Sequence, residues 1–249
     1  MIYASLTFWL LVVVLTAWGV HRLWGQMIKP KVFNTILLPG TLVAQMGHVI
    51  GLLITGATIS NTTLIADDES GEPETTPNPK PRIPVIGPVV IGMLPLVACA
   101  LALFLVASRL GGSMVATIQG AVISPTLPTT MSGFWQLLRD QITLVESIAA
   151  ALAGADLTSG FTWLFVYLLI CLTVRMAPFK GYLRGSLGAI LVLGIGAAAV
   201  ASLFDVADPR VQSGWAVLSL TVGTLNLLLI TSLVVRGAVG LTHILKSEA

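Results

Sequence analysis

His48 is the residue whose neighbours come nearest to a catalytic pattern in this chain. It lies in the apolar segment Leu38–Gly56, four residues after Ala44, and Gln45 follows Ala44 directly. A helix that binds catalytic zinc carries two histidines four residues apart on one face, and a glutamate beside the first acts as the general base. Only the second histidine is present here. The segment is therefore interpreted as a zinc-binding helix that has lost the first histidine and the glutamate.

The elements that must position these residues are membrane helices. Hydrophobic residues make up 55% of the 249 residues and charged residues only 10%, against about 25% charged residues in soluble domains. We therefore expect an all-α, polytopic membrane helix bundle that forms a single integral membrane domain over residues 1–249. Cys99 and Cys171 lie inside apolar runs, which favours small buried side chains over a disulfide.

Apolar runs predict about six transmembrane helices, because each crossing needs about 20 residues. Pro88 and Pro95 lie inside one of these runs and predict a kinked or locally broken helix. Residues 111–130 are expected to form a polar connection. The predicted spans are Ile2–Val20, Ile36–Thr58, Pro84–Ser108, Phe161–Met176, Ser186–Phe204 and Trp215–Val235.

The segment Ala66–Arg82 has a different composition from the rest of the chain. Five acidic residues alternate there with prolines, among them Asp67, Glu74, Pro77 and Pro81. Such a segment buries little apolar surface and cannot hold a regular hydrogen-bonded ladder. Residues 66–82 are therefore predicted to form an extended or disordered acidic loop.

Residues 132–153 predict an additional, amphipathic helix. Polar side chains recur on one side at helical spacing, and apolar side chains line the other. The helix either crosses the membrane with its polar side turned to a protein interior or lies at the interface, and the pattern favours neither. Its polar side is a candidate partner-binding surface, made of Gln136, Arg139, Asp140, Thr143 and Glu146.

Basic residues indicate the orientation of the chain. His21, Arg22, Lys29 and Lys31 follow the first apolar run, and no Lys or Arg precedes it. Since cytoplasmic loops are enriched in Lys and Arg, we expect the N-terminus outside and the C-terminus in the cytoplasm. The groups Arg175, Lys180, Arg184 and Arg236, Lys246 are expected on the cytoplasmic side as well, and His21, Trp135, Tyr182 and His243 at membrane flanks.

Four segments in order resemble the site-2-type intramembrane zinc metalloproteases of bacteria. The first reads Pro39-Gly40-Thr41-Leu42-Val43-Ala44-Gln45-Met46-Gly47-His48, and the others are Ile91–Leu96, Phe134–Asp140 and Arg175–Leu183. The resemblance implies that Ala44 takes the place of a zinc-binding histidine and Gln45 that of the general base. It also implies that Tyr182 replaces an acidic third ligand, which leaves His48 alone.

A single imidazole cannot supply the three protein ligands of a catalytic zinc, and an amide such as Gln45 cannot act as a base near neutral pH. The resemblance therefore implies a pseudoprotease, with no catalytic residue, no metal and no cofactor. We expect a multi-pass protein of the bacterial plasma membrane. Its expected partners are the lipid bilayer and other membrane protein subunits, with no nucleic acid, and its role that of a scaffold, an accessory subunit or a binder of transmembrane segments.

Two alternatives stay open from the sequence. One is an active intramembrane metalloprotease with relocated ligands, drawn from His48 with Asp140 or Glu146. The other is a small transporter or channel, for which the proline-containing helix and the polar side of residues 132–153 are the only indications. Inverted repeats, which many transporters have, are not evident.

Overall fold

The structure, a computed structural model, describes residues 2–56, 59–63, 74–77, 86–118, 123–177, 187–192, 194–196 and 209–247. Helices dominate it, with one small two-stranded sheet. Residues 187–192 and 194–196 are also helical. The elements are α1 (Ile2–Met27), α2 (Pro30–Ile36), α3 (Leu38–Ile54), β1 (Ile59–Thr63), β2 (Glu74–Pro77), α4 (Ile86–Leu110), α5 (Gly112–Ile118), α6 (Met131–Ala153), α7 (Gly160–Val174) and α9 (Pro209–Ser247).

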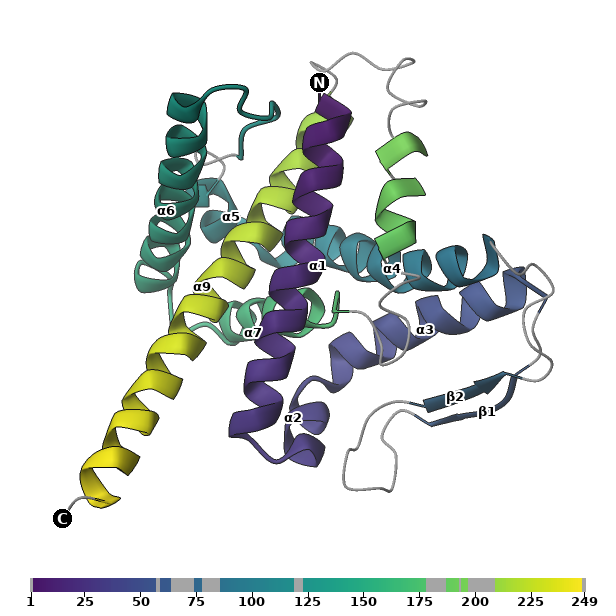
Figure 1. Ribbon diagram of the computed structural model, residues 1–249, viewed down its shortest axis with the longest axis horizontal. Coiled ribbons are helices and arrows are strands. Elements are labelled where there is room, and N and C mark those ends of the chain that lie inside the picture. The colour runs from purple at the N-terminus through teal and green to yellow at the C-terminus, as the bar shows by residue number, and fades with distance from the viewer. Residues whose placement is uncertain are drawn as a thin grey trace.

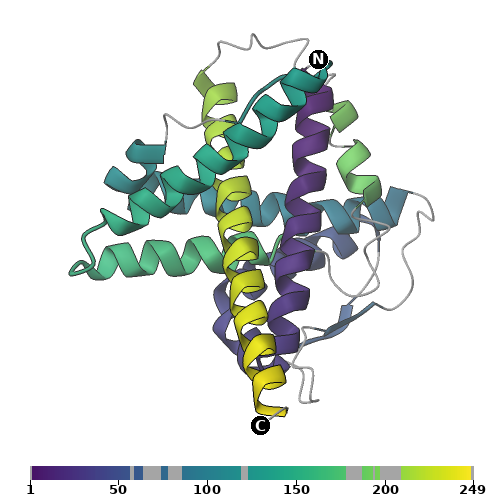
Figure 2. The same ribbon diagram turned by 60° about the vertical axis from the view of Figure 1, so that its left-hand side comes forward.

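The large helices form two crossing layers. In the first, α1 and α9 lie side by side and run in the same direction, so that the N-terminus and the C-terminus lie at opposite ends of the molecule (Figures 1 and 2). In the second, α3, α4 and α7 pack on one another and run across α1 and α9. Helix α6 packs on α9 and α5 and so belongs to neither layer.

The main core lies where the layers cross. Helix α1 contributes Trp9, Val13, Ala17 and Val20, all nearly inaccessible to solvent. Their spacing of three to four residues places them on one face of the helix. They join buried residues of α4, α7 and α9 in one cluster, which includes Cys99, Leu103, Phe165, Leu172 and Leu225. Cys99 and Cys171 are both free, and both are buried, which confirms the prediction that they pack as small buried side chains.

In the part of the chain that the structure describes, three helices are long and apolar enough to cross a membrane: Ser5–Met27, Gly87–Leu110 and Gln212–Thr242. A fourth span results if α2 and α3 are taken as one broken span. Several long apolar helices are thus compatible with a membrane protein, but the predicted count of about six is not confirmed. Helix α7 has only 15 residues, fewer than the roughly 20 that a crossing needs.

The predicted span Ile36–Thr58 is a helix with a sharp bend before it. Helices α2 and α3 meet at Leu37 at an angle of 82°. Pro39 lies in the first turn of α3, where its missing N–H costs no hydrogen bond. At the other end, Gly56 has φ 78°, a left-handed conformation that ends a helix and suits glycine.

Two local predictions were wrong. Residues 74–77 of the predicted acidic loop form β2, which pairs antiparallel with β1; the rest of 66–82 lies outside the described residues. The predicted connection 111–130 contains helix α5, which begins at Gly112, where φ is 42°. Of the two forms predicted for the helix with Pro95, kinked or locally broken, the break does not occur: α4 runs unbroken through Pro95, because the loss of one backbone hydrogen bond can be tolerated where neighbouring helices support a long apolar helix.

Candidate functional site

The candidate site predicted from the sequence lies on the buried face of α3. Ala44, Gln45 and His48 are 0%, 3% and 4% exposed. Residues four apart share a helix face, and the same face buries Thr41 and Leu52. The fourth predicted residue, Tyr182, lies outside the described residues, so the structure positions only the α3 half of the site.

Direct contact between backbones closes this face of α3. A methyl group at Gly47 would lie 2.6 Å from the carbonyl oxygen of Leu94 and 2.9 Å from the Cα of Pro95, both in α4. A methyl group at Gly40 would overlap the carbonyl oxygen of Cys171 in α7. Small residues allow such close approach between membrane helices. The face that would hold a metal is therefore filled by the neighbouring helices.

The chemistry available on this face is limited. Ala44 offers no donor atom, the amide of Gln45 is neither an acid nor a base near neutral pH, and His48 supplies one imidazole. Neither Gln45 nor His48 is left without an interaction partner. Within the described ranges, no group of three or more His, Cys, Asp or Glu side chains is placed to hold a metal ion.

A buried polar connection that the sequence did not predict lies beside this face. Arg175 ends α7 and is only 5% exposed, and its Nη2 donates a hydrogen bond of 2.5 Å to Oδ1 of Asn34 in α2. Its guanidinium also lies 5.9 Å from the ring of Phe33, and its Cγ lies 3.1 Å from the methyl position of Gly40. Arg175, predicted only as one of a basic group on the cytoplasmic side, is therefore a buried residue that joins α7 to α2.

An aromatic group surrounds the Asn34 end of this connection. The ring of Phe33 stacks on His21 at 5.0 Å and meets Trp24 edge-on at 5.9 Å. Trp24 in turn donates from its Nε1 to the hydroxyl of Ser232 in α9, at 2.6 Å. His21 is thus held against an aromatic ring, where the sequence predicted an open membrane flank. The only sequence signal was a polar residue, Asn34, in the short segment between two apolar runs.

The residues predicted to bind a partner lie together on α6. Gln136, Arg139, Thr143 and Glu146 are exposed and Asp140 is half-buried, and Nε2 of Gln136 donates to Oδ1 of Asp140 at 2.9 Å. The helix is held to α9 by a hydrogen bond from Nδ2 of Asn226 to Oε1 of Gln141, at 2.9 Å. Asn226 and Gln141 were not predicted, because Asn226 is a single polar residue in an apolar stretch and Gln141 was not among the polar residues assigned to the partner-binding side of residues 132–153.

The structure places the residues proposed as relocated zinc ligands in separate parts of the molecule. His48 is buried where α3 packs on α4 and α7, whereas Asp140 and Glu146 lie on α6, which packs on α9 and α5.

Compared with known proteins, the chain matches no family model, no curated protein and no solved structure at the level at which relationship can be inferred.

Proposed function

We propose that this chain is a non-catalytic integral membrane protein that acts as a scaffold or accessory subunit, or that binds transmembrane segments of other proteins. The observation that carries the proposal is the filled face of α3, where Ala44, Gln45 and His48 lie buried and Gly47 packs directly on the backbone of α4. Catalytic zinc requires three protein ligands and an open position for water. Among the described residues, this face supplies one imidazole and closely packed backbones, which argues against both requirements.

The resemblance to site-2-type metalloproteases supports the same proposal. In that interpretation the helices α3, α4 and α7 keep the shape of a protease core without its metal. A fold shaped to receive a peptide segment between helices is suited to hold one without cleaving it. The exposed polar residues of α6 are the surface that we propose for a partner subunit: Gln136, Arg139, Asp140, Thr143 and Glu146.

The proposed orientation has the N-terminus outside and the C-terminus in the cytoplasm of a bacterial plasma membrane. Helices α1 and α9 run in the same direction, and the basic residues Arg22, Lys29 and Lys31 lie at or after the end of α1. Arg236 of α9 reaches the same end, where its Nη1 donates to Oε1 of Gln26 at 2.5 Å. Positive charge on one side of a membrane is typical of the cytoplasmic side.

Purification in a mild detergent tests the proposed function. We expect a preparation without stoichiometric zinc that retains at least one other membrane protein. The variant His48→Ala serves as the control, since it removes the remaining imidazole. A preparation that carries close to one zinc per chain, lost in His48→Ala, would overturn the proposal.

A further inference from the structure

Helix α6 has three faces of different character. The first is buried: Leu144 and Ile148 contact the methyl position of Gly223 in α9, and Leu137 and Ala151 complete this face. Gly223 lies within the candidate span Gln212–Thr242. The buried face therefore holds α6 directly against a helix that is able to cross the membrane.

The second face is an exposed apolar strip. Phe134, Leu138 and Ile142 are 45%, 38% and 60% exposed, and their spacing of four residues aligns them along one side of the helix. Trp135 lies beside them and is 64% exposed. Large apolar side chains that line up on the surface of one helix mark a surface that is covered in the cell.

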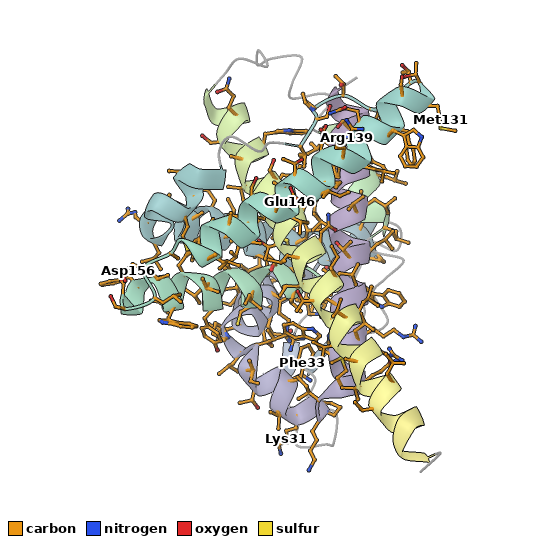
Figure 3. All side chains as sticks on the ribbon, turned by 90° about the vertical axis from the view of Figure 1, so that its left-hand side faces the viewer. Lys31, Phe33, Met131, Arg139, Glu146 and Asp156 are labelled. Atoms are coloured by element: carbon orange, nitrogen blue, oxygen red, sulfur yellow. The ribbon has the colours of Figure 1, made fainter. Side chains whose placement is uncertain are left out.

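The third face is an exposed polar strip that runs parallel to the apolar strip. It consists of Gln136, Arg139, Thr143 and Glu146, which recur every three to four residues. Figure 3 shows Met131, Arg139 and Glu146 in order along the helix. The two exposed strips therefore cover the same stretch of the helix and lie at different angles around its axis.

The exposed charged residues of α6 decide between the two positions that the sequence left open for this helix, across the membrane or at its interface. Helix α6 has 23 residues, which is enough to cross a bilayer, yet it is not among the helices apolar enough to do so. Arg139 and Glu146 lie near its middle and are exposed, so a crossing helix would place both in the acyl chains. Charged side chains at that depth are strongly unfavourable unless they pair with one another or face the bundle interior or a water-filled cavity.

We infer that α6 lies in the plane of the membrane, with the apolar strip Phe134, Leu138 and Ile142 inserted at the boundary between acyl chains and headgroups. The lipid bilayer itself therefore covers this apolar strip. Helices of this kind insert their apolar side by about 5–10 Å. The polar strip then faces the headgroups and water, where Arg139 meets lipid phosphates and where the surface stays open to a peripheral partner.

Spin labels at single cysteines test this placement. The apolar strip is labelled through Leu138→Cys and Ile142→Cys, and the polar strip through Gln136→Cys and Thr143→Cys, each in the full chain reconstituted in bilayers. Leu105→Cys on α4 serves as the reference for a site in acyl chains and Lys31→Cys as the reference for water, since both side chains are exposed. The wild-type chain measures background labelling of Cys99 and Cys171, which are buried.

The readout is the ratio of collision rates with oxygen, which concentrates in acyl chains, and with a water-soluble nickel complex. We expect the ratio at positions 138 and 142 to shift toward that of Leu105→Cys and the ratio at positions 136 and 143 toward that of Lys31→Cys. High oxygen accessibility at all four positions would mean that α6 crosses the membrane. High nickel accessibility at all four would mean that lipid does not cover the apolar strip. Either result would overturn the inference.

Discussion

Arg175 at the end of α7 donates a hydrogen bond of 2.5 Å to the side-chain oxygen of Asn34 in α2. The two residues are 141 positions apart in the chain, and both are buried. The bond joins the layer of α3, α4 and α7 to the short helix that precedes the 82° bend. Arg175 also contacts Gly40 and Phe33. It therefore holds the N-terminal end of α3, the helix that carries the candidate site.

The first prediction concerns this bond. Asn34→Ala removes the acceptor while the guanidinium stays buried, so we expect the free energy of unfolding to fall by about 1.5–3 kcal/mol, as for other hydrogen bonds to charged groups. Denaturant unfolding in detergent micelles measures the change. Arg109→Gln, at an exposed position in the last turn of α4, is the matched control and should change stability by less than about 0.5 kcal/mol. Equal effects of both variants would contradict the role assigned to Arg175.

The second prediction concerns the contact between α3 and α4. Gly47→Ala places a methyl group against the carbonyl of Leu94, and we expect it to lower the free energy of unfolding by about 1–3 kcal/mol, the usual cost of overpacking. Gly237→Ala in α9 is the control, because its methyl group meets nothing within 4 Å. Alanine favours a helix by up to about 1 kcal/mol over glycine, so the control should unfold at the same or a higher denaturant concentration.

The third prediction is that a metal chelator does not destabilise the protein. A metal that binds only the folded state raises its stability, by about 2.7 kcal/mol when free metal exceeds the dissociation constant a hundredfold. If the face of α3 holds no metal, the thermal midpoint with and without chelator should coincide. Comparison with His48→Ala identifies the site, since a chelator effect seen only in the wild-type chain would place a metal at His48.

The fourth prediction concerns orientation. In bacterial spheroplasts, a maleimide that cannot cross the membrane should label Gln212→Cys, which lies at the outer end of α9 in our proposal, and should spare Lys31→Cys. Both positions are exposed, so the difference reports the side of the membrane. After the membrane is made permeable, Lys31→Cys should react as well. Labelling of Lys31→Cys alone in intact spheroplasts would reverse the proposed topology.

The fifth prediction concerns Asp156 in the turn before α7. The hydroxyl and then the backbone N–H of Thr158 donate to Oδ1 of Asp156, at 2.6 and 3.0 Å, and lower the pKa of this exposed carboxyl. Because the pKa in the folded state lies below that in the unfolded state, near 3.9, the stabilisation is complete above the unfolded pKa. It is lost as the pH falls through the folded pKa.

The variant Asp156→Asn tests the sign of this effect, because the amide does not titrate. We expect the difference in unfolding midpoint between the wild-type chain and Asp156→Asn to be constant from pH 7 down to about pH 5 and to change only near the carboxyl pKa. A difference that varies between pH 5 and 7 would mean that another group is responsible.

The sequence predicted most of the helices, though not how they meet. Long apolar runs marked α1, α4 and α9, and the 3.6-residue alternation marked α6, because hydrophobic periodicity is a local signal. The spacing of Ala44, Gln45 and His48 placed all three on one helical face for the same reason. The pairing of β2 with β1 was missed, since strand pairing depends on a partner and not on the composition of one strand.

By itself, the sequence determined that the chain consists mainly of apolar helices, that its cysteines lie inside them and that the α3 face carries only one imidazole. These features follow from residue types and from spacing within one helix. The tertiary structure alone decided that Gly40 and Gly47 close that face, that Arg175 is buried against Asn34 and that α6 has separate apolar and polar exposed strips. The first two relationships join helices far apart in the chain, and the exposure of each side of α6 depends on which side packs on α9. Packing between distant segments leaves no periodic signal in either of them.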